Sequence, residues 1–170
     1  GMRSAVLRYG NVIGSRGSVL HLWRRQAAAG EWLTVTDPEA TRFWLTLSDA
    51  AVLALAVLHD LRGGEIVVPK LSACRIVDLA TAISGDPDRI KVTGLRPGGE
   101  KLHEQLLSDE EIGRTTDCGA VYIVAPALCS WTTWEPVGLP VSASLRYTSD
   151  TALRAMDDQI KDWLSDVGDE

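Results

Sequence analysis

The sequence is poor in the residues that build metal centres and disulfide frameworks. It contains three cysteines and three histidines among 170 residues, and neither set has the spacing of a metal-ligand cluster. An odd number of thiols without such spacing is typical of reduced cysteines in the cytoplasm. We therefore expect a cytoplasmic protein that holds no metal ion.

Long apolar runs and clusters of positive charge are also lacking. The longest apolar stretch, residues 50–58, is far too short to cross a bilayer. Met2 and Arg3 lead straight into a strand-like run, so no signal peptide is expected. The net charge is −6, and no run of lysine or arginine could follow a phosphate backbone. We expect a protein that binds neither membranes nor nucleic acids.

Several catalytic motifs are missing from the sequence. It has no serine nucleophile elbow, no P-loop and no Cys-x-x-Cys pair. It has no Tyr-x-x-x-Lys pair either, because the residues four positions after the tyrosines are Ile13, Pro126 and Thr151. The chain therefore offers candidate binding residues without an obvious catalytic centre.

Strand-like and helix-like segments alternate along the chain. Short apolar runs that end at turn residues predict strands over residues 4–9, 32–36, 65–68, 90–94 and 120–124. Capping residues and apolar spacings of three and four predict helices over residues 18–29, 48–61 and 76–83 and after residue 108. This alternation predicts an α/β fold.

A last helix is predicted to open at Ser149 and Asp150. The residues of its inner face are Leu153, Met156, Ile160 and either Trp163 or Leu164. The stretch before it, residues 126–140, has no clear period and is predicted to be irregular.

The segment RYGNVIGSRG, residues 8–17, lies between the first predicted strand and the first predicted helix. Gly10, Gly14 and Gly17 precede a helix start, whose backbone N–H groups attract phosphate. Asp37 follows at about the distance of a ribose-binding carboxylate in dinucleotide sites. However, the glycine spacing differs from G-x-G-x-x-G, and an Asp-Pro-Glu sequence is also typical of a turn. A small dinucleotide site therefore remains an alternative.

A second candidate is Arg42, which is followed by Phe43 and Trp44. The planar fork of arginine suits phosphate oxygens, and neighbouring aromatic rings can form a wall for a base or sugar. The alternative is that the aromatic residues belong to the core and that Arg42 forms an ordinary ion pair. Taken alone, this segment favours the second interpretation, because surface ion pairs are common, and it leaves the ligand interpretation open.

A third candidate is the stretch GLRPGGEKLHE, residues 94–104. Its Pro-Gly-Gly turn holds Arg96, Glu100 and Lys101 close together, so that Arg96 could clamp a diphosphate while Glu100 accepts from a sugar or ribose hydroxyl. A solvated turn with local charge pairing is the alternative. His103 has no partner in the sequence pattern and is interpreted as a structural histidine.

Four blocks together resemble one family: LRYGNVIGSRGSV, TVTDPEATRFWLTLSDA, GGEIVVPK and GLRPGGEKLHEQLLSDEE. They are similar to the C-terminal half of UDP-N-acetylglucosamine 4,6-dehydratases of bacterial polysaccharide biosynthesis, which are extended short-chain dehydrogenases/reductases. The resemblance implies the end of a Rossmann-like sheet followed by a smaller substrate-binding lobe. Residues 2–30 would supply the last strand and helix of the sheet, and residues 31–170 would form the lobe with its C-terminal helix.

The resemblance also implies roles for five residues. Asn11 would contact the sugar nucleotide, and Tyr9 would lie near the nicotinamide end of the cofactor. Arg42 and Arg96 would meet the phosphates or the nucleoside of UDP, and Glu100 would bind the ribose. No catalytic residue and no metal ligand are implied within this sequence.

Members of that family begin with a glycine-rich Rossmann fingerprint and carry a Tyr-x-x-x-Lys pair just before the RYGN segment, whereas this sequence starts after both. The resemblance therefore implies NAD or NADP as the cofactor of the complete enzyme, with none bound by this chain alone. The implied partners are a UDP-sugar and either a missing N-terminal Rossmann half or full-length relatives. We expect the chain to be inactive alone.

An alternative is a non-catalytic protein derived from the same fold, which binds a sugar nucleotide or acts as a scaffold within an oligomer. Unpaired edges of a sheet invite association. We therefore also expect a homo-oligomer that buries Val6 and Leu7 between chains.

Overall fold

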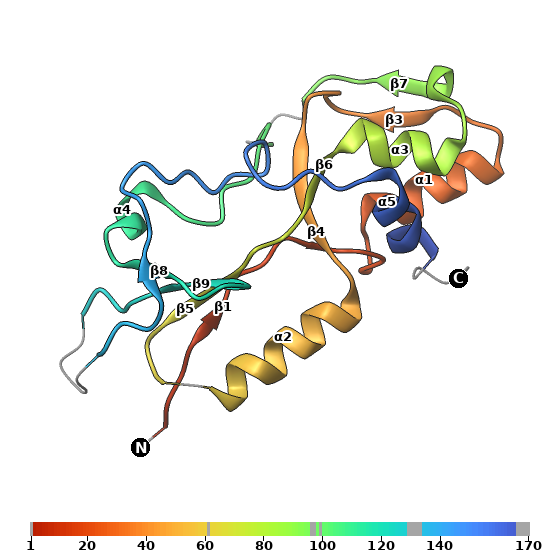
Figure 1. Cartoon of the computed structure of the whole chain (residues 1–170). Helices are drawn as coiled ribbons and strands as arrows, with labels where there is room; N and C mark the ends of the chain where they lie inside the picture. The colour runs from red at the N-terminus through yellow and green to blue at the C-terminus, as the bar shows by residue number, and fades with distance from the viewer. Residues whose placement is uncertain (1, 61, 96–97, 99, 129–133, 166–170) are drawn as a thin grey trace.

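The computed structural model describes residues 2–60, 62–95, 98, 100–128 and 134–165 of a mixed α/β chain with two apolar cores (Figure 1). The fold class agrees with the prediction. One lobe contains three helices, a 3-10 turn and a parallel two-stranded sheet. These elements are α1 (Val19–Ala28), α3 (Ile76–Ser84), α5 (Asp157–Ser165), η1 (Pro87–Arg89), β3 (Leu33–Val35) and β7 (Ile90–Val92).

The other lobe is built on a five-stranded sheet with the order β1-β5-β9-β8-β10. β1 pairs in parallel with β5, and the other pairs are antiparallel. The short helix α4 (Asp109–Ile112) lies at the same end of the molecule (Figure 1). The strands are β1 (Val6–Leu7), β5 (Ile66–Pro69), β8 (Thr115–Asp117), β9 (Val121–Val124) and β10 (Leu139–Pro140).

A third, three-stranded sheet runs between the two lobes (Figure 1). It consists of β2 (Asn11–Val12), β4 (Thr41–Leu45) and β6 (Ala73–Arg75), with β4 in the centre. β4 pairs in parallel with β2 and antiparallel with β6. The helix α2 (Leu47–His59) follows β4 directly and lies on the lower side of the molecule in Figure 1.

Local sequence signals explain most of the helix boundaries. α1 begins after Ser18 and is followed by Gly30, whose φ of 72° is a left-handed conformation that suits glycine. α2 begins at Leu47, one residue before the predicted start, because Thr46 is the N-cap and accepts a hydrogen bond from the Asp49 N–H at 3.0 Å. Asp49 is the third helical residue, and its carboxylate accepts the Thr46 N–H to complete the capping box.

Several segments differ from the predictions because they pair with other parts of the chain. β2, β4, β6 and β8 were not expected as strands, and each forms by pairing with another segment. The last helix starts at Asp157 and not at Ser149, because Ala73 in β6 bonds the preceding chain through Leu153 O (2.9 Å) and the Ala155 N–H (2.8 Å). Leu153 and Met156 are consequently exposed, whereas Ile160 and Trp163 are buried as predicted. The predicted irregular stretch contains β10, and part of it lies outside the described residues.

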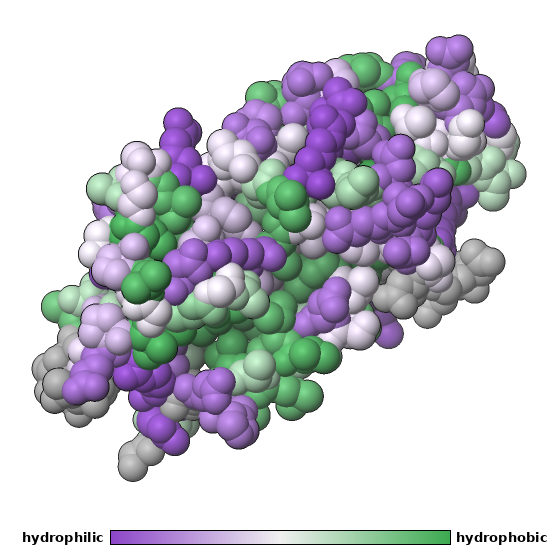
Figure 2. Space-filling view, viewed as in Figure 1, coloured by the Kyte–Doolittle hydropathy of each residue, from purple (hydrophilic) through white to green (hydrophobic). Residues whose placement is uncertain are grey.

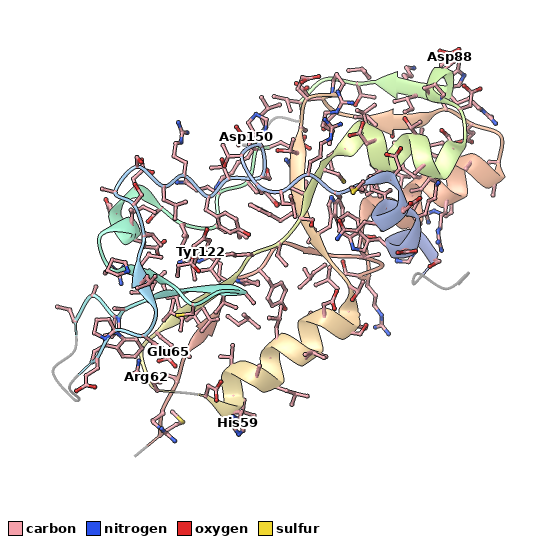
Figure 3. All side chains as sticks on the ribbon, in the orientation of Figure 1. His59, Arg62, Glu65, Asp88, Tyr122 and Asp150 are labelled. Atoms are coloured by element: carbon pink, nitrogen blue, oxygen red, sulfur yellow. The ribbon has the colours of Figure 1, made fainter. Side chains whose placement is uncertain are left out.

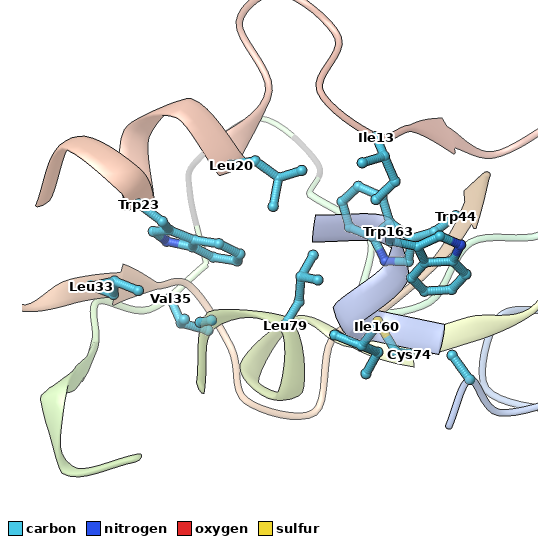
Figure 4. Packing of buried hydrophobic residues seen from close by; sticks show 12 residues of the cluster. Ile13, Leu20, Trp23, Leu33, Val35, Trp44, Cys74, Leu79, Ile160 and Trp163 are labelled. Carbon is cyan, nitrogen blue, oxygen red and sulfur yellow. The ribbon is translucent and has the colours of Figure 1, made fainter. Parts of the chain in front are cut away.

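The core of the helical lobe is packed from several elements that are distant in sequence (Figure 4). Trp23 on α1 is fully buried, and its indole N–H donates to Thr34 O at 2.8 Å. This bond satisfies the one polar atom of the ring, so the indole can pack without an unpaired donor. Its partners in the cluster include Leu20, Leu33, Val35, Leu79, Ile160 and Trp163. The predicted boundary at residue 30 thus falls between α1 and β3, which share one core.

The core of the sheet lobe is centred on Phe43 and Tyr147, whose ring centroids are 5.0 Å apart. The Tyr147 hydroxyl donates to Pro69 O at 2.9 Å and accepts the Leu71 N–H at 2.6 Å. Burial raises the pKa of this phenol to about 12, so it stays protonated and can keep donating. The ring therefore ties the C-terminal region to the end of β5.

A buried carboxylate closes the turn between α2 and β5. Glu65 accepts the Gly63 N–H at 2.6 Å and the Arg62 N–H at 2.7 Å (Figure 3). Arg62 in turn donates to Glu135 O at 2.7 Å. These bonds satisfy the polar groups of a turn that leads into a buried strand.

We predict that Trp23→Ala lowers the free energy of unfolding by about 3–5 kcal/mol, because it removes a fully buried ring and leaves a cavity. Urea denaturation followed by circular dichroism measures the change. Trp32→Ala is the matched control, since Trp32 lies in the same lobe with its ring exposed, and it should cost less than about 1 kcal/mol. Equal losses for the two variants would contradict this account of the core.

Candidate functional site

A pocket of about 310 Å³ lies between the first turn of α1 and the strands β2, β3 and β4. Asn11, Arg42 and Glu100 line it, so the structure brings together three residues singled out from the sequence. The wall also contains two tryptophans, Trp23 and Trp44. The pocket therefore combines aromatic surface with an amide, a cation and a carboxylate.

Asn11 is held firmly at the edge of this pocket. Its amide nitrogen donates to both carboxylate oxygens of Glu104, at 3.0 and 3.1 Å, and lies 3.2 Å from Phe43 O. Glu104 also accepts the Phe43 N–H at 3.1 Å. The same carboxylate thus binds β2 and β4 and fixes the orientation of the Asn11 side chain.

Arg42 projects from β4 and is also engaged within the protein. Its Nη1 donates to Thr41 O at 2.7 Å and to Leu102 O at 3.0 Å. Two carboxylates flank the guanidinium: Glu100 lies 3.9 Å from Nη2, and Glu104 lies 3.8 Å from Nε. Only 14% of the Arg42 side chain is exposed. The guanidinium is therefore preorganised, and its charge is partly balanced before any ligand arrives.

Glu100 connects the 94–104 stretch to β3 and its following loop. Its carboxylate accepts a hydrogen bond from the Thr36 hydroxyl at 2.9 Å, and Thr36 lines the same pocket. Thr36 and the flanking ion pair hold the carboxylate at the wall of the pocket, where a ligand hydroxyl could donate to it.

The mouth of the pocket also contains the N-terminus of α1. Gly17 and Ser18 line the pocket beside the exposed Arg16. Ser18 occupies the N-cap position, but its hydroxyl makes no capping bond, and its buried Oγ has no hydrogen-bond partner among the described residues. A helix N-terminus, an arginine and an unpaired hydroxyl together suit an anionic group.

Ser18 and Arg16 were not selected as site residues from the sequence. Ser18 was expected to cap α1 with its side chain, and only the three-dimensional arrangement shows that this hydroxyl lacks a partner. Glu104 was likewise missed, because its contacts with β2 and β4 connect segments that are far apart in the chain.

Two of the remaining candidates, Tyr9 and Asp37, are not among the residues that line the pocket, and the third lies outside the described residues. Tyr9 is 40% exposed and is not among the residues that line the pocket. Arg96 falls outside the described residues, as do Pro97 and Gly99 of the same turn. Asp37 accepts the Glu39 N–H at 2.8 Å, which agrees with the turn interpretation of the Asp-Pro-Glu sequence.

An ion pair joins the RYGN segment to α4. Arg8 donates to the two carboxylate oxygens of Glu111 at 2.7 and 2.8 Å and to Leu106 O at 2.9 Å. The hydrogen bonds from Arg8, together with one from the Ser108 N–H at 2.9 Å, lower the pKa of Glu111 to about 2. The next residues of the segment are packed tightly, since a Cβ at Gly10 would collide with the Phe43 backbone and Cβ. The residues on either side of Tyr9 are therefore fixed by contacts with two other segments.

His103 belongs to a chain of polar side chains near the site. Its Nδ1 lies 2.8 Å from the Thr41 hydroxyl, which lies 2.6 Å from the Ser149 hydroxyl. Ser149 also accepts the Glu104 N–H at 2.9 Å and bonds Thr41 O at 3.0 Å. These contacts agree with a structural role for His103, since they link β4 to the chain after β10.

The described residues contain no group of three or more histidine, cysteine, aspartate or glutamate residues that could hold a metal ion. Burial raises the pKa of the Cys74 thiol to about 12, and Cys118 is also a free thiol. Within the described ranges, no helix has both the length and the apolar character needed to cross a membrane.

The sequence matches one protein family over most of its length. Residues 1–126 match the family described as polysaccharide biosynthesis protein. An inverting UDP-N-acetylglucosamine 4,6-dehydratase from Campylobacter jejuni is 38% identical over 127 residues, which cover 74% of this chain and 37% of that protein. A UDP-glucose 4-epimerase from Rickettsia canadensis is 41% identical over 120 residues, which cover 69% of this chain and 35% of that protein. The chain thus spans little more than a third of these curated relatives.

A solved structure extends the match to both lobes. Pen from Bacillus thuringiensis superposes with a TM-score of 0.81 and 26% sequence identity. The superposition covers 96% of this chain and 50% of that chain. The arrangement of the two lobes therefore recurs within a longer protein.

The Arg8–Glu111 pair makes stability depend on pH. The folded-state pKa of Glu111 is about 2, below its ordinary value of 4.5, so its stabilising effect is fully present above pH 4.5 and disappears as the pH falls towards 2. We predict that Glu111→Gln lowers the free energy of unfolding at pH 7 by about 2–3 kcal/mol.

The difference between wild type and Glu111→Gln should shrink steadily below pH 4.5 in urea titrations. Glu110→Gln is the matched control, because the neighbouring Glu110 is exposed and should change stability by less than about 0.5 kcal/mol. A difference between Glu111→Gln and wild type that stayed constant down to pH 2 would refute the assignment.

Proposed function

Because the chain belongs to the polysaccharide biosynthesis protein family, we propose that it forms the sugar-nucleotide-binding part of a NAD(P)-dependent dehydratase or epimerase. The substrate class is UDP-N-acetylglucosamine or a similar UDP-sugar, as in the names of the two curated relatives. The observation that carries the proposal is the single pocket in which Asn11, Arg42 and Glu100 meet the N-terminus of α1.

The diphosphate is proposed to lie at the N-terminus of α1. Backbone N–H groups there would donate to phosphate oxygens, and the unpartnered Ser18 hydroxyl would gain an acceptor. Arg16 adds a positive charge, and because this residue is exposed its guanidinium can turn towards a bound phosphate. Arg42 contributes less net charge, since Glu100 and Glu104 already flank it. We further propose that Arg96 approaches the phosphates or the nucleoside.

The nucleoside and the sugar would occupy the rest of the pocket. Glu100 is placed to accept hydrogen bonds from ribose hydroxyls, and Trp44 offers an aromatic wall. Asn11 also lines the pocket, and we propose that it contacts the sugar nucleotide. These residues bind and orient the substrate, and none of them is proposed as a catalytic acid or base.

The nicotinamide cofactor of the complete enzyme would accept and return a hydride during dehydration or epimerisation. Tyr9 is the residue of this chain that we propose near it, and its partial exposure leaves room for such a contact. We propose that residues outside this chain bind most of the cofactor and carry out the proton transfer. A cytoplasmic location fits the free thiols of Cys74 and Cys118.

We predict that UDP and UDP-N-acetylglucosamine raise the melting temperature of the protein, whereas NAD and NADP alone do not. Calorimetric titration with UDP then compares two exposed arginines, Arg16→Gln in the pocket and Arg146→Gln elsewhere on the surface. Arg16→Gln should weaken UDP binding by about tenfold, because it removes a charge-assisted bond to phosphate. Arg146→Gln should leave the affinity unchanged.

Stabilisation by NAD or NADP without a response to any UDP-sugar would overturn the proposal and favour a dinucleotide site at the same loop. Equal affinities of the two arginine variants for UDP would contradict the proposed position of the diphosphate at the N-terminus of α1.

The ribose contact has a separate test. Glu100→Gln should weaken UDP binding by about tenfold but leave the affinity for inorganic diphosphate unchanged, because only UDP presents ribose hydroxyls. Calorimetric titration with the two ligands gives both affinities. A parallel loss for both ligands would show that Glu100 acts by holding Arg42 instead of binding the ribose.

A further inference from the structure

The side-chain amide of Asn11 has two chemically different ends, and its surroundings decide which end a ligand meets. An amide nitrogen donates hydrogen bonds, and an amide oxygen accepts them. The nitrogen faces three acceptors, which are the two carboxylate oxygens of Glu104 at 3.0 and 3.1 Å and Phe43 O at 3.2 Å. With the amide turned around, its oxygen would face the same three acceptors with no proton between them. The neighbours therefore fix the orientation of the amide.

The Glu104 carboxylate is itself held from several sides. It accepts the Phe43 N–H at 3.1 Å, and Arg42 Nε lies 3.8 Å away. The Glu104 backbone is fixed as well, because its N–H donates to the Ser149 hydroxyl at 2.9 Å and its carbonyl accepts the Ser149 N–H at 2.8 Å. The acceptors that Asn11 meets are thus in place without any ligand.

The oxygen of the Asn11 amide is the end left for a ligand. In the part of the chain that the structure describes, Asn11 Oδ1 has no hydrogen-bond partner, whereas the amide nitrogen has three acceptors for its two protons. Asn11 lines the pocket, so its side chain offers a ligand there an acceptor and no spare donor. Phosphate oxygens also accept and cannot pair with Oδ1, but hydroxyl and amide N–H groups can.

We propose that Asn11 Oδ1 accepts a hydrogen bond from a hydroxyl or N–H group of the substrate's sugar, and that Glu104 is the positioning residue that enforces this polarity. The assignment rests on the proposed function, in which the diphosphate lies at the N-terminus of α1 and Glu100 binds the ribose. Apart from the single N–H of uracil, the sugar then carries all the remaining donors of the ligand. Asn11 therefore discriminates between UDP and a UDP-sugar, and Glu104 acts through Asn11.

The test compares the dissociation constants of UDP and UDP-N-acetylglucosamine by calorimetric titration. Glu104→Gln keeps the size of the side chain but introduces an amide N–H, so the Asn11 amide is no longer forced into one orientation. UDP-N-acetylglucosamine should bind about tenfold more weakly. UDP should bind at least as tightly as before, because the substitution removes a carboxylate beside Arg42. Glu39→Gln is the matched control, since it removes the same charge from an exposed side chain outside the pocket and should change neither affinity.

A second variant tests the contact directly. Asn11→Ala removes the acceptor and leaves the bond from the Phe43 N–H to Glu104, so it tests the contact even where Glu104→Gln does not fold. It should cause the same tenfold loss for UDP-N-acetylglucosamine and none for UDP. In the Asn11→Ala background, Glu104→Gln should cause no further loss of preference, because Glu104 acts through Asn11.

Self-association is controlled separately. The helix α2 exposes apolar side chains such as Leu55 and Leu58, and Figure 2 shows this apolar surface on the lower side of the molecule. Exposed apolar patches promote association. Light scattering at the titration concentrations therefore checks that wild type and variants share one oligomeric state.

The two ligands separate this proposal from the proposed function. Equal losses for UDP and UDP-N-acetylglucosamine in Asn11→Ala or Glu104→Gln, or additive losses in the double variant, would overturn the proposal and leave Glu104 a purely structural role. A wild type that binds the two ligands equally would also overturn it, while the diphosphate site would stand. A wild type that binds neither ligand would overturn the proposed function as well.

Discussion

The arrangement of the two lobes depends on the carboxylate of Glu104, which lies where several distant segments meet. It accepts the Asn11 amide from β2 and the Phe43 N–H from β4, while its own backbone exchanges hydrogen bonds with Ser149. A buried or half-buried carboxylate requires such donors, because an unpaired charge would be costly. The same bonds orient Asn11 and bring β4, with Arg42, into contact with the 94–104 stretch. The binding pocket and the junction between the lobes therefore share one polar cluster.

The sequence was sufficient to predict the helices and strands whose signals are local. α1, α3 and β9 form close to their predicted positions, and Ser108 and Glu111 form the predicted capping box of α4. The sequence was insufficient to predict segments whose conformation is decided by pairing with a distant part of the chain. Residues 149–156 carry helical apolar spacing, but residues 149–151 form a turn, and the bonds from Ala73 to Leu153 and Ala155 then hold residues 153–155 next to β6. Only when the chain leaves β6 can α5 begin.

The candidate site was likewise predictable only in part from the sequence. Resemblance to a family singled out Asn11, Arg42 and Glu100, and the structure places all three around one pocket. Neither composition nor spacing could have revealed that Arg42 is flanked by two carboxylates or that Ser18 Oγ has no partner. These two facts change how the site would attract an anion. The charge of Arg42 is partly balanced, so the helix N-terminus and Arg16 supply most of the unbalanced positive potential.

The short segment between β1 and β2 links the pocket to the five-stranded sheet. β1 ends at Leu7 and β2 begins at Asn11, so only residues 8–10 separate the two strands. Arg8 is fixed by Glu111, and Gly10 is packed against Phe43 with no room for a Cβ. The conformation of this segment is therefore set by its contacts with α4 and β4. The position of Asn11 in the pocket is consequently defined by the chain itself, before any ligand binds.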